Sequence, residues 1–157
     1  MEQKILAEKV ARLLAGRKWI LGTVECGVKG VVSHQIFDTP HGPTVLGNSL
    51  IVDSVTEAIG LLDLPRSQFK KAGYFSLKAA RAAAREGRTF LRANLCLVVW
   101  TPSDDDDSKE RQSAHIALNT GSQALSRTIH YERSDEQATA QLIVQALDMM
   151  QQALSWS

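Results

Sequence analysis

One segment constrains the fold more than any other, because the run Leu95-Cys96-Leu97-Val98-Val99-Trp100 is apolar at every position. A strand with one face in water alternates apolar and polar side chains, whereas a strand covered on both faces stays apolar throughout. We therefore predict a central strand over 95–100, in a sheet with helices on both faces. The 157 residues are enough to bury such a core, so we expect a single domain over 1–157.

The other elements are predicted from hydrophobic periodicity and from turn residues. Helices are expected at 4–15, 31–37, 54–62, 65–72, 76–86 and 135–154, and strands at 19–24, 44–52, 113–118 and 125–131. Gly16 and Gly87 are expected to end the helices that precede them, and Ser54 and Ser76 to begin theirs as N-caps. The last two strands form a hairpin around 119–122. This order predicts an α/β fold, a three-layer α/β/α domain with a mixed, mostly parallel sheet of about five strands.

Charge and composition exclude several classes of function. The formal net charge is +1, which lacks the basic excess of a nucleic-acid-binding protein, so no nucleic-acid partner is expected. Basic groups such as Lys70-Lys71 and Arg81, Arg85 and Arg88 are interpreted as solvated helix faces. No apolar run approaches the ~20 residues of a membrane span, and no signal peptide opens the chain, so we expect a cytoplasmic protein without membrane contact.

The histidines and cysteines form no metal-binding pattern. His34, His41, His115 and His130 lack the H-E-x-x-H spacing, and Cys26 and Cys96 are too few and too far apart for a zinc site or a disulfide framework. We therefore expect no metal and no cofactor.

The segment Thr23–Gly30 is the most suggestive for chemistry. A strand that ends in a glycine-containing turn before a helix can hold a nucleophile at the helix N-terminus, where free N–H groups and the helix dipole lower a thiol pKa. Cys26 lies at that place, beside Glu25. The same pattern also fits an inert, buried structural cysteine, and the spacing alone leaves both interpretations open.

Several segments resemble one known family in order and spacing. The turn Val24-Glu25-Cys26-Gly27-Val28-Lys29-Gly30 stands where that family has A-E-S-C-T-G-G. Asp38–Gly42 stands for its D-x-P-G-S motif and Leu61–Pro65 for its L-L-G-V-P motif. Gly73–Ser76 stands for G-A-V-S, and Ala93–Leu95 stands for A-D-L. From Leu6 to Leu154 the chain is similar to the C-terminal domain of the CinA competence/damage-inducible proteins, the nicotinamide-nucleotide amidase family. Members hydrolyse nicotinamide mononucleotide to nicotinic acid mononucleotide and ammonia.

The resemblance implies the location of a site. Cys26 takes the position of the family's serine nucleophile, and Glu25 or Asp53 would assist it as a base. The N–H groups of Gly27 and Val28 would stabilise the oxyanion. The resemblance implies a substrate-binding set of Gly27, Val28, Gly30, Ser54 and Thr101. It also implies a nucleotide-like small-molecule ligand and a homodimer or other homo-oligomer.

The departures from the family pattern concern catalysis. The family's active-site tyrosine and lysine, in Y-S-N-E-A-K, are lost where this chain has Asp53–Ala58. Its glycine-rich loop has become Val99–Asp107, where Trp100 fills space and four aspartates would repel a phosphate. We therefore expect a divergent relative of the amidohydrolase with lost or altered catalytic activity. The alternatives are an active amidohydrolase with Cys26 as its nucleophile, and an oligomeric binding or regulatory module.

Overall fold

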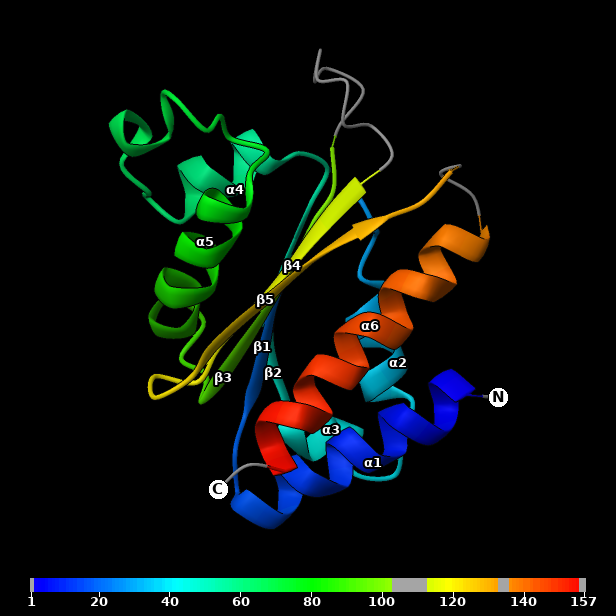
Figure 1. Ribbon diagram of the computed structural model, residues 1–157. Helices are drawn as coiled ribbons and strands as arrows, with labels where there is room; N and C mark the ends of the chain where they lie inside the picture. The colour runs from blue at the N-terminus through cyan, green and yellow to red at the C-terminus, as the bar shows by residue number, and fades with distance from the viewer. Residues whose placement is uncertain (1, 103–112, 133–135, 156–157) are drawn as a thin grey trace.

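The sheet of this protein has five strands in the order β2-β1-β3-β4-β5 (Figure 1). The computed structural model describes residues 2–102, 113–132 and 136–155, which leaves the predicted acidic loop Asp104–Asp107 outside the described residues. The strands are β1 Leu21–Cys26, β2 Leu46–Val52, β3 Leu95–Trp100, β4 Ser113–Asn119 and β5 Ala124–His130. β1 pairs in parallel with β2 and β3, whereas β4 is antiparallel to both β3 and β5. Four of the five strands therefore point the same way, and the predicted mixed, mostly parallel sheet is confirmed.

Helices cover both faces of the sheet, which confirms the three-layer prediction (Figure 1). One face carries α1 Glu2–Arg17, α2 Val31–Phe37, α3 Gly42–Val45 and α6 Glu136–Ser155. The other face carries α4 Val55–Leu61, the 3₁₀ helix η1 Arg66–Phe69 and α5 Leu77–Phe90. Within the described residues, no helix has the length and apolarity needed to cross a membrane.

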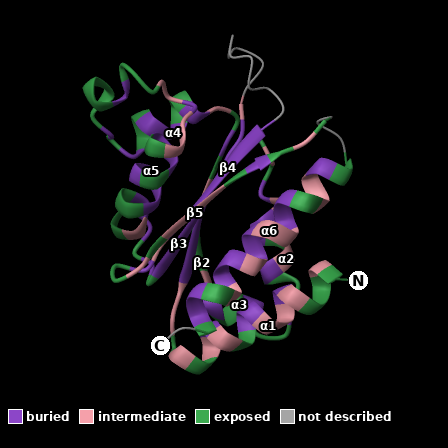
Figure 2. Cartoon of the chain, in the orientation of Figure 1, coloured by how far each residue is buried: buried purple, intermediate pink, exposed green. Residues whose placement is uncertain are grey.

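The central strand β3 divides the interior into two cores. Leu95, Leu97 and Val99 pack in the cluster that includes α1 and α6. Their neighbours Cys96, Val98 and Trp100 pack in the cluster that includes α4 and α5. All six side chains are fully buried, as the alternation of a strand covered on both faces requires (Figure 2).

Two glycines expected to end helices do not do so. α1 continues through Gly16 to Arg17, and the left-handed residue after it is Lys18, with φ 58°. The N–H groups of Lys18 and Trp19 donate to the carbonyls of Ala15 and Leu14, both at 3.0 Å. This pair of bonds satisfies the last carbonyls of α1, so the stop lies two residues beyond the predicted one.

Gly87 lies inside α5, where it serves close packing. A Cβ on Gly87 would lie 2.8 Å from Cys96 Sγ and 3.3 Å from Val24 Cγ2. α5 can approach the sheet this closely because residue 87 has no side chain. The helix continues to Phe90.

The remaining differences concern short elements. β1 begins and ends two residues later than predicted, the segment 65–72 contains only the 3₁₀ helix η1, and α3 was not predicted. Both predicted N-caps are confirmed. Ser54 Oγ accepts from Glu57 N–H at 3.2 Å, and Ser76 Oγ accepts from Ala79 N–H at 3.1 Å.

The first and last helices are fastened together. α1 and α6 pack side by side on the sheet (Figure 1). At the end of α1, Arg17 Nη2 donates to the carbonyl of Leu154 in the last turn of α6, at 2.6 Å. The same guanidinium lies 4.8 Å from the ring centroid of Trp19. Donation to a C-terminal carbonyl complements the helix dipole, so Arg17 stabilises the contact between the two helices.

Candidate functional site

The turn 27–30 lies where β1, β2 and β3 end side by side. Gly27, with φ +83°, donates its N–H to the carbonyl of Val52 at the end of β2, at 2.9 Å. Thr101, directly after β3, donates its hydroxyl to the carbonyl of Cys26 at 2.7 Å. A Cβ on Gly27 would lie 2.3 Å from Thr101 Oγ1. The three strand ends are thus joined by hydrogen bonds that only glycine at position 27 accommodates.

Cys26 is the last residue of β1, and its side chain is fully buried in the core with α4 and α5. In register beside it lie Val52 on β2 and Trp100 on β3. Burial raises the pKa of the thiol far above its ordinary value, and the negative charge of Glu25 raises it further. The thiol is therefore neutral at physiological pH and packed among apolar side chains.

Glu25 lies on the opposite face of the sheet from Cys26, because successive residues of a strand alternate. Its side chain is fully buried, and its carboxylate meets the first turn of α2. Oε1 accepts from Val32 N–H at 2.8 Å, and Oε2 accepts from Ser33 N–H at 3.0 Å and from Ser33 Oγ at 2.5 Å. Charge-assisted bonds of this kind are strong. Glu25 therefore occupies the helix N-terminus that was expected to activate a thiol.

A group of hydroxyls continues from Glu25 to the edge of the sheet. Ser33 Oγ lies 2.6 Å from Thr23 Oγ1, and Thr23 Oγ1 donates to Ser49 Oγ at 2.8 Å. Thr23 is fully buried, whereas Ser49 is exposed on the edge strand β2. Sequence reasoning missed this network, although Thr23 and Glu25 stand two residues apart in β1 and so share one face.

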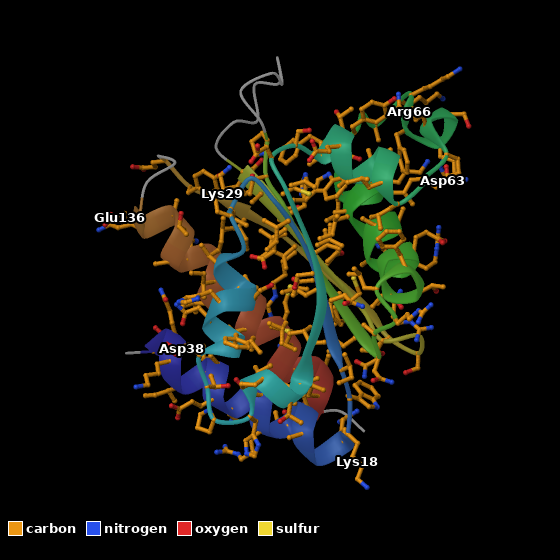
Figure 3. All side chains as sticks on the ribbon, turned by 180° about the vertical axis from the view of Figure 1, so that it is seen from behind. Lys18, Lys29, Asp38, Asp63, Arg66 and Glu136 are labelled. Carbon is orange, nitrogen blue, oxygen red and sulfur yellow. The ribbon has the colours of Figure 1, made fainter. Side chains whose placement is uncertain are left out.

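Asp53 and Lys29 lie at the surface of the same end of the sheet. Lys29 Nζ contacts Asp53 Oδ1 at 2.5 Å, and both side chains are more than three-quarters exposed. Figure 3 shows Lys29 at the end of β1, with Lys18 at the opposite end of the molecule. Asp53 therefore points outward to a lysine, away from the buried Cys26 thiol.

The other residues of the expected substrate-binding set have structural contacts. Gly30, with φ +78°, precedes α2, and a Cβ there would lie 2.7 Å from Ile51 Cδ1. Val28 packs against the core with α1 and α6, and Ser54 caps α4. The structure thus brings Cys26, Gly27 and Thr101 together and directs Glu25 and Asp53 elsewhere.

Trp100 fills the interior next to Cys26. Its side chain is fully buried, and its indole N–H donates to the carbonyl of Tyr74 at 2.8 Å. The next position in register is His115 on β4. His115 Nδ1 lies 2.9 Å from Thr128 Oγ1, and its ring centroid is 4.8 Å from that of Phe75. The place beside Cys26 on β3 is therefore filled by the Trp100 side chain.

Within 2–102, 113–132 and 136–155, no group of three or more histidine, cysteine, aspartate or glutamate side chains is arranged to hold a metal ion.

Comparison with known proteins gives one family model, described as the CinA C-terminal domain, which matches residues 3–154. Among solved structures, a CinA superfamily protein from Klebsiella pneumoniae is 15% identical with a TM-score of 0.86, covering 98% of both chains. A competence or damage-inducible protein from Enterobacter asburiae is 17% identical with a TM-score of 0.87, covering 97% of this chain and 98% of that one. A competence/damage-inducible protein from Agrobacterium tumefaciens is 16% identical with a TM-score of 0.87, covering 99% and 96%. No curated protein sequence matches the chain. At these identities the structural likeness carries the fold alone.

Proposed function

Because this chain belongs to the CinA C-terminal domain family, we propose that it is a divergent member that has kept the fold and lost the amide hydrolysis of nicotinamide mononucleotide. The position equivalent to the family's nucleophile holds Cys26. The proposal rests on how Cys26 is placed.

The buried state of Cys26 is the observation that supports lost catalysis. A cysteine attacks as a thiolate, and attack requires a low pKa and access to the substrate. Cys26 is fully buried beside Trp100, and burial raises its pKa. Both properties are the reverse of those of a catalytic cysteine.

The groups that would assist Cys26 are engaged elsewhere. The Glu25 carboxylate accepts three hydrogen bonds from Val32 and Ser33 on the other face of the sheet. Asp53 pairs with Lys29 at the surface. The Gly27 N–H, a potential oxyanion donor, bonds to Val52. A general base must reach the proton that it removes, and an oxyanion donor must point at the developing charge, so this arrangement supports neither role.

Ammonia release from nicotinamide mononucleotide tests the proposal. The purified chain, Cys26→Ala and Cys26→Ser would be incubated with substrate, beside a family member that has the complete A-E-S-C-T-G-G turn as positive control. We expect no ammonia above the blank from the chain or from either variant, and turnover by the positive control. Turnover by the chain that Cys26→Ala abolishes would establish a thiol amidohydrolase and refute the proposal. Turnover that survives Cys26→Ala would refute it as well.

The nucleotide-like ligand remains a separate proposal, because binding can outlast the loss of chemistry. Isothermal titration of the chain with nicotinamide mononucleotide would detect such binding without turnover. A null titration at millimolar ligand would remove the nucleotide from the proposal and leave the lost hydrolysis unaffected.

A further inference from the structure

The basic residues of this chain are strongly segregated. Residues 66–92 contain eight lysines and arginines and one acidic residue, a net charge of +7. The rest of the chain therefore carries a net charge of −6, since the whole carries +1. The eight basic residues are Arg66, Lys70, Lys71, Lys78, Arg81, Arg85, Arg88 and Arg92. We call this set the basic ridge.

The middle of the basic ridge is a stripe along the outer side of α5. Lys78, Arg81 and Arg85 are exposed. Arg88 is half-buried, and its guanidinium lies against Gly121 in the turn between β4 and β5. At about 100° and 1.5 Å per residue, these four lie within an arc of about 80° and along about 15 Å of helix. Between residues 78 and 88 every exposed or half-buried side chain is charged, and the others are buried alanines and Gly87. Figure 2 shows the buried side of α5 turned to the sheet and its exposed side turned away.

The basic ridge continues beyond both ends of α5. Arg66, Lys70 and Lys71 are exposed in and just after η1, beside the start of α5, and Figure 3 labels Arg66 on this outer edge. Arg92 is exposed just past the other end, with φ 56°. The single acidic residue, Glu86, is 3.4 Å from Arg85, and both side chains are about half or more exposed. Such a surface pair is weak, so the stripe keeps nearly all its positive charge.

We propose that the basic ridge binds the sugar-phosphate backbone of duplex nucleic acid without sequence preference. A row of lysines and arginines along one helix is the electrostatic footprint of such binding, because each cation that neutralises a phosphate releases a counterion. No nucleic-acid partner was expected because the net charge of the whole chain is only +1. That value is the sum of a basic segment and an acidic remainder, so it does not reveal the basic ridge. The cations stand on a convex helix of about 10–12 Å diameter, a width that the ~12 Å major groove of B-DNA admits.

The same surface lacks what other polyanionic partners require. Insertion at an anionic membrane needs exposed apolar side chains beside the cations, but the alanines of α5 are buried against the sheet. Phe90, the exposed large apolar side chain of α5, lies about 140° round the helix from Arg85. Single-stranded nucleic acids bind in grooves lined with aromatic rings, and the stripe has no aromatic side chain. Acidic proteins need an apolar centre in the interface, and the stripe has none.

Fluorescence anisotropy with a fluorescein-labelled 25-base-pair DNA duplex, between 50 and 200 mM NaCl, tests the proposal. If the three exposed cations of α5 each neutralise one phosphate, log K should fall with log salt at a slope of about −2.7. Arg81→Glu/Arg85→Glu should reduce that slope to about −0.9. If the affinities of parent and variant are equal near 1 M salt, the loss of two contacts weakens binding roughly 60-fold at 100 mM, because each contact contributes about eightfold per tenfold change in salt.

Lys4→Glu/Arg12→Glu is the matched control. It makes the same change in net charge at two exposed positions of α1, on the other side of the sheet. Its affinity should stay within about twofold of the parent, because charges beyond a Debye length of ~10 Å are largely screened. Thermal melts of all variants would establish that each is folded.

Three results would overturn the proposal. They are no duplex binding at 50 mM salt, an equal loss in the α1 control, and binding of poly-glutamate or phosphatidylserine vesicles as tight as that of the duplex. The last would assign the basic ridge to an acidic protein or to a membrane surface.

Discussion

Replacing Glu25 by glutamine tests the role that the structure gives to this buried carboxylate. The substitution keeps the size and shape of the side chain and removes its charge. Three donors now face the two carboxylate oxygens, namely Val32 N–H, Ser33 N–H and Ser33 Oγ. A glutamine offers one acceptor oxygen, and its NH₂ group must face at least one of these donors.

The magnitude follows from these contacts. Hydrogen bonds to a charged group contribute about 1 kcal/mol more than neutral ones, so two retained bonds lose about 2 kcal/mol. The mispaired buried N–H costs about 1–3 kcal/mol more. Removing a charge from the interior offsets part of the loss, because a buried charge is costly. We expect Glu25→Gln to lower the free energy of unfolding by about 2–4 kcal/mol.

Urea unfolding at pH 7, followed by circular dichroism, measures this change. Glu86→Gln is the matched control, because Glu86 is exposed and its contact with Arg85 is weak; we expect a change within about 0.5 kcal/mol. If Glu25→Gln is as stable as the parent, the carboxylate is not what holds the start of α2, and Glu25 returns as a candidate for the chemistry of the site.

Two further predictions concern glycine and cysteine. Gly27→Ala should lower the free energy of unfolding by about 2–3 kcal/mol, from its left-handed φ and the lost Thr101–Cys26 hydrogen bond. Gly16 lies in α1, and nothing lies within 4 Å of an added Cβ, so Gly16→Ala should raise the free energy of unfolding by about 0.5–1 kcal/mol. If urea unfolding shows that both variants are stabilised, or that both are destabilised, this account is contradicted. Burial raises the pKa of Cys96 from 9.0 to about 12, opposed by Arg88. From pH 9 towards 12 the unfolded thiol loses its proton first, so Cys96 makes stability fall by about 1.4 kcal/mol per pH unit. Cys96→Ala should remove this contribution and leave the one from Cys26, whose pKa burial also raises. A pH profile identical to that of the parent would show that Cys96 is accessible.

The sequence was sufficient for the layers of this fold because its signals were local. The apolar run 95–100 became β3 with unchanged bounds, and the hairpin of β4 and β5 and the caps at Ser54 and Ser76 followed from nearby residues. Gly16 and Gly87 were misassigned because glycine has several uses. Whether Gly87 ends a helix or admits Cys96 depends on a strand that lies elsewhere in the chain.

The site depended on a boundary that sequence reasoning places least well. A strand ending at Val24 would have left Glu25 and Cys26 in a turn, free to act together. Because β1 runs to Cys26, the pleat sends these two side chains to opposite faces. Because β1 ends two residues later than predicted, Glu25 contacts α2 and Cys26 packs beside Trp100.

The bond between Arg17 and Leu154 has a consequence for synthesis on the ribosome. These residues are 137 positions apart, so α1 emerges long before the helix that it packs against. At roughly 5–20 residues per second, α1 waits about 7–27 s for α6 to be made. During that time the apolar side of α1 lacks its neighbour α6, and transiently exposed apolar surface of this kind favours aggregation. A circular permutation that joins residues 157 and 1 by a linker, with new termini between α1 and α6, would place the two helices next to each other in the chain. They could then pair soon after synthesis, which would shorten that exposure.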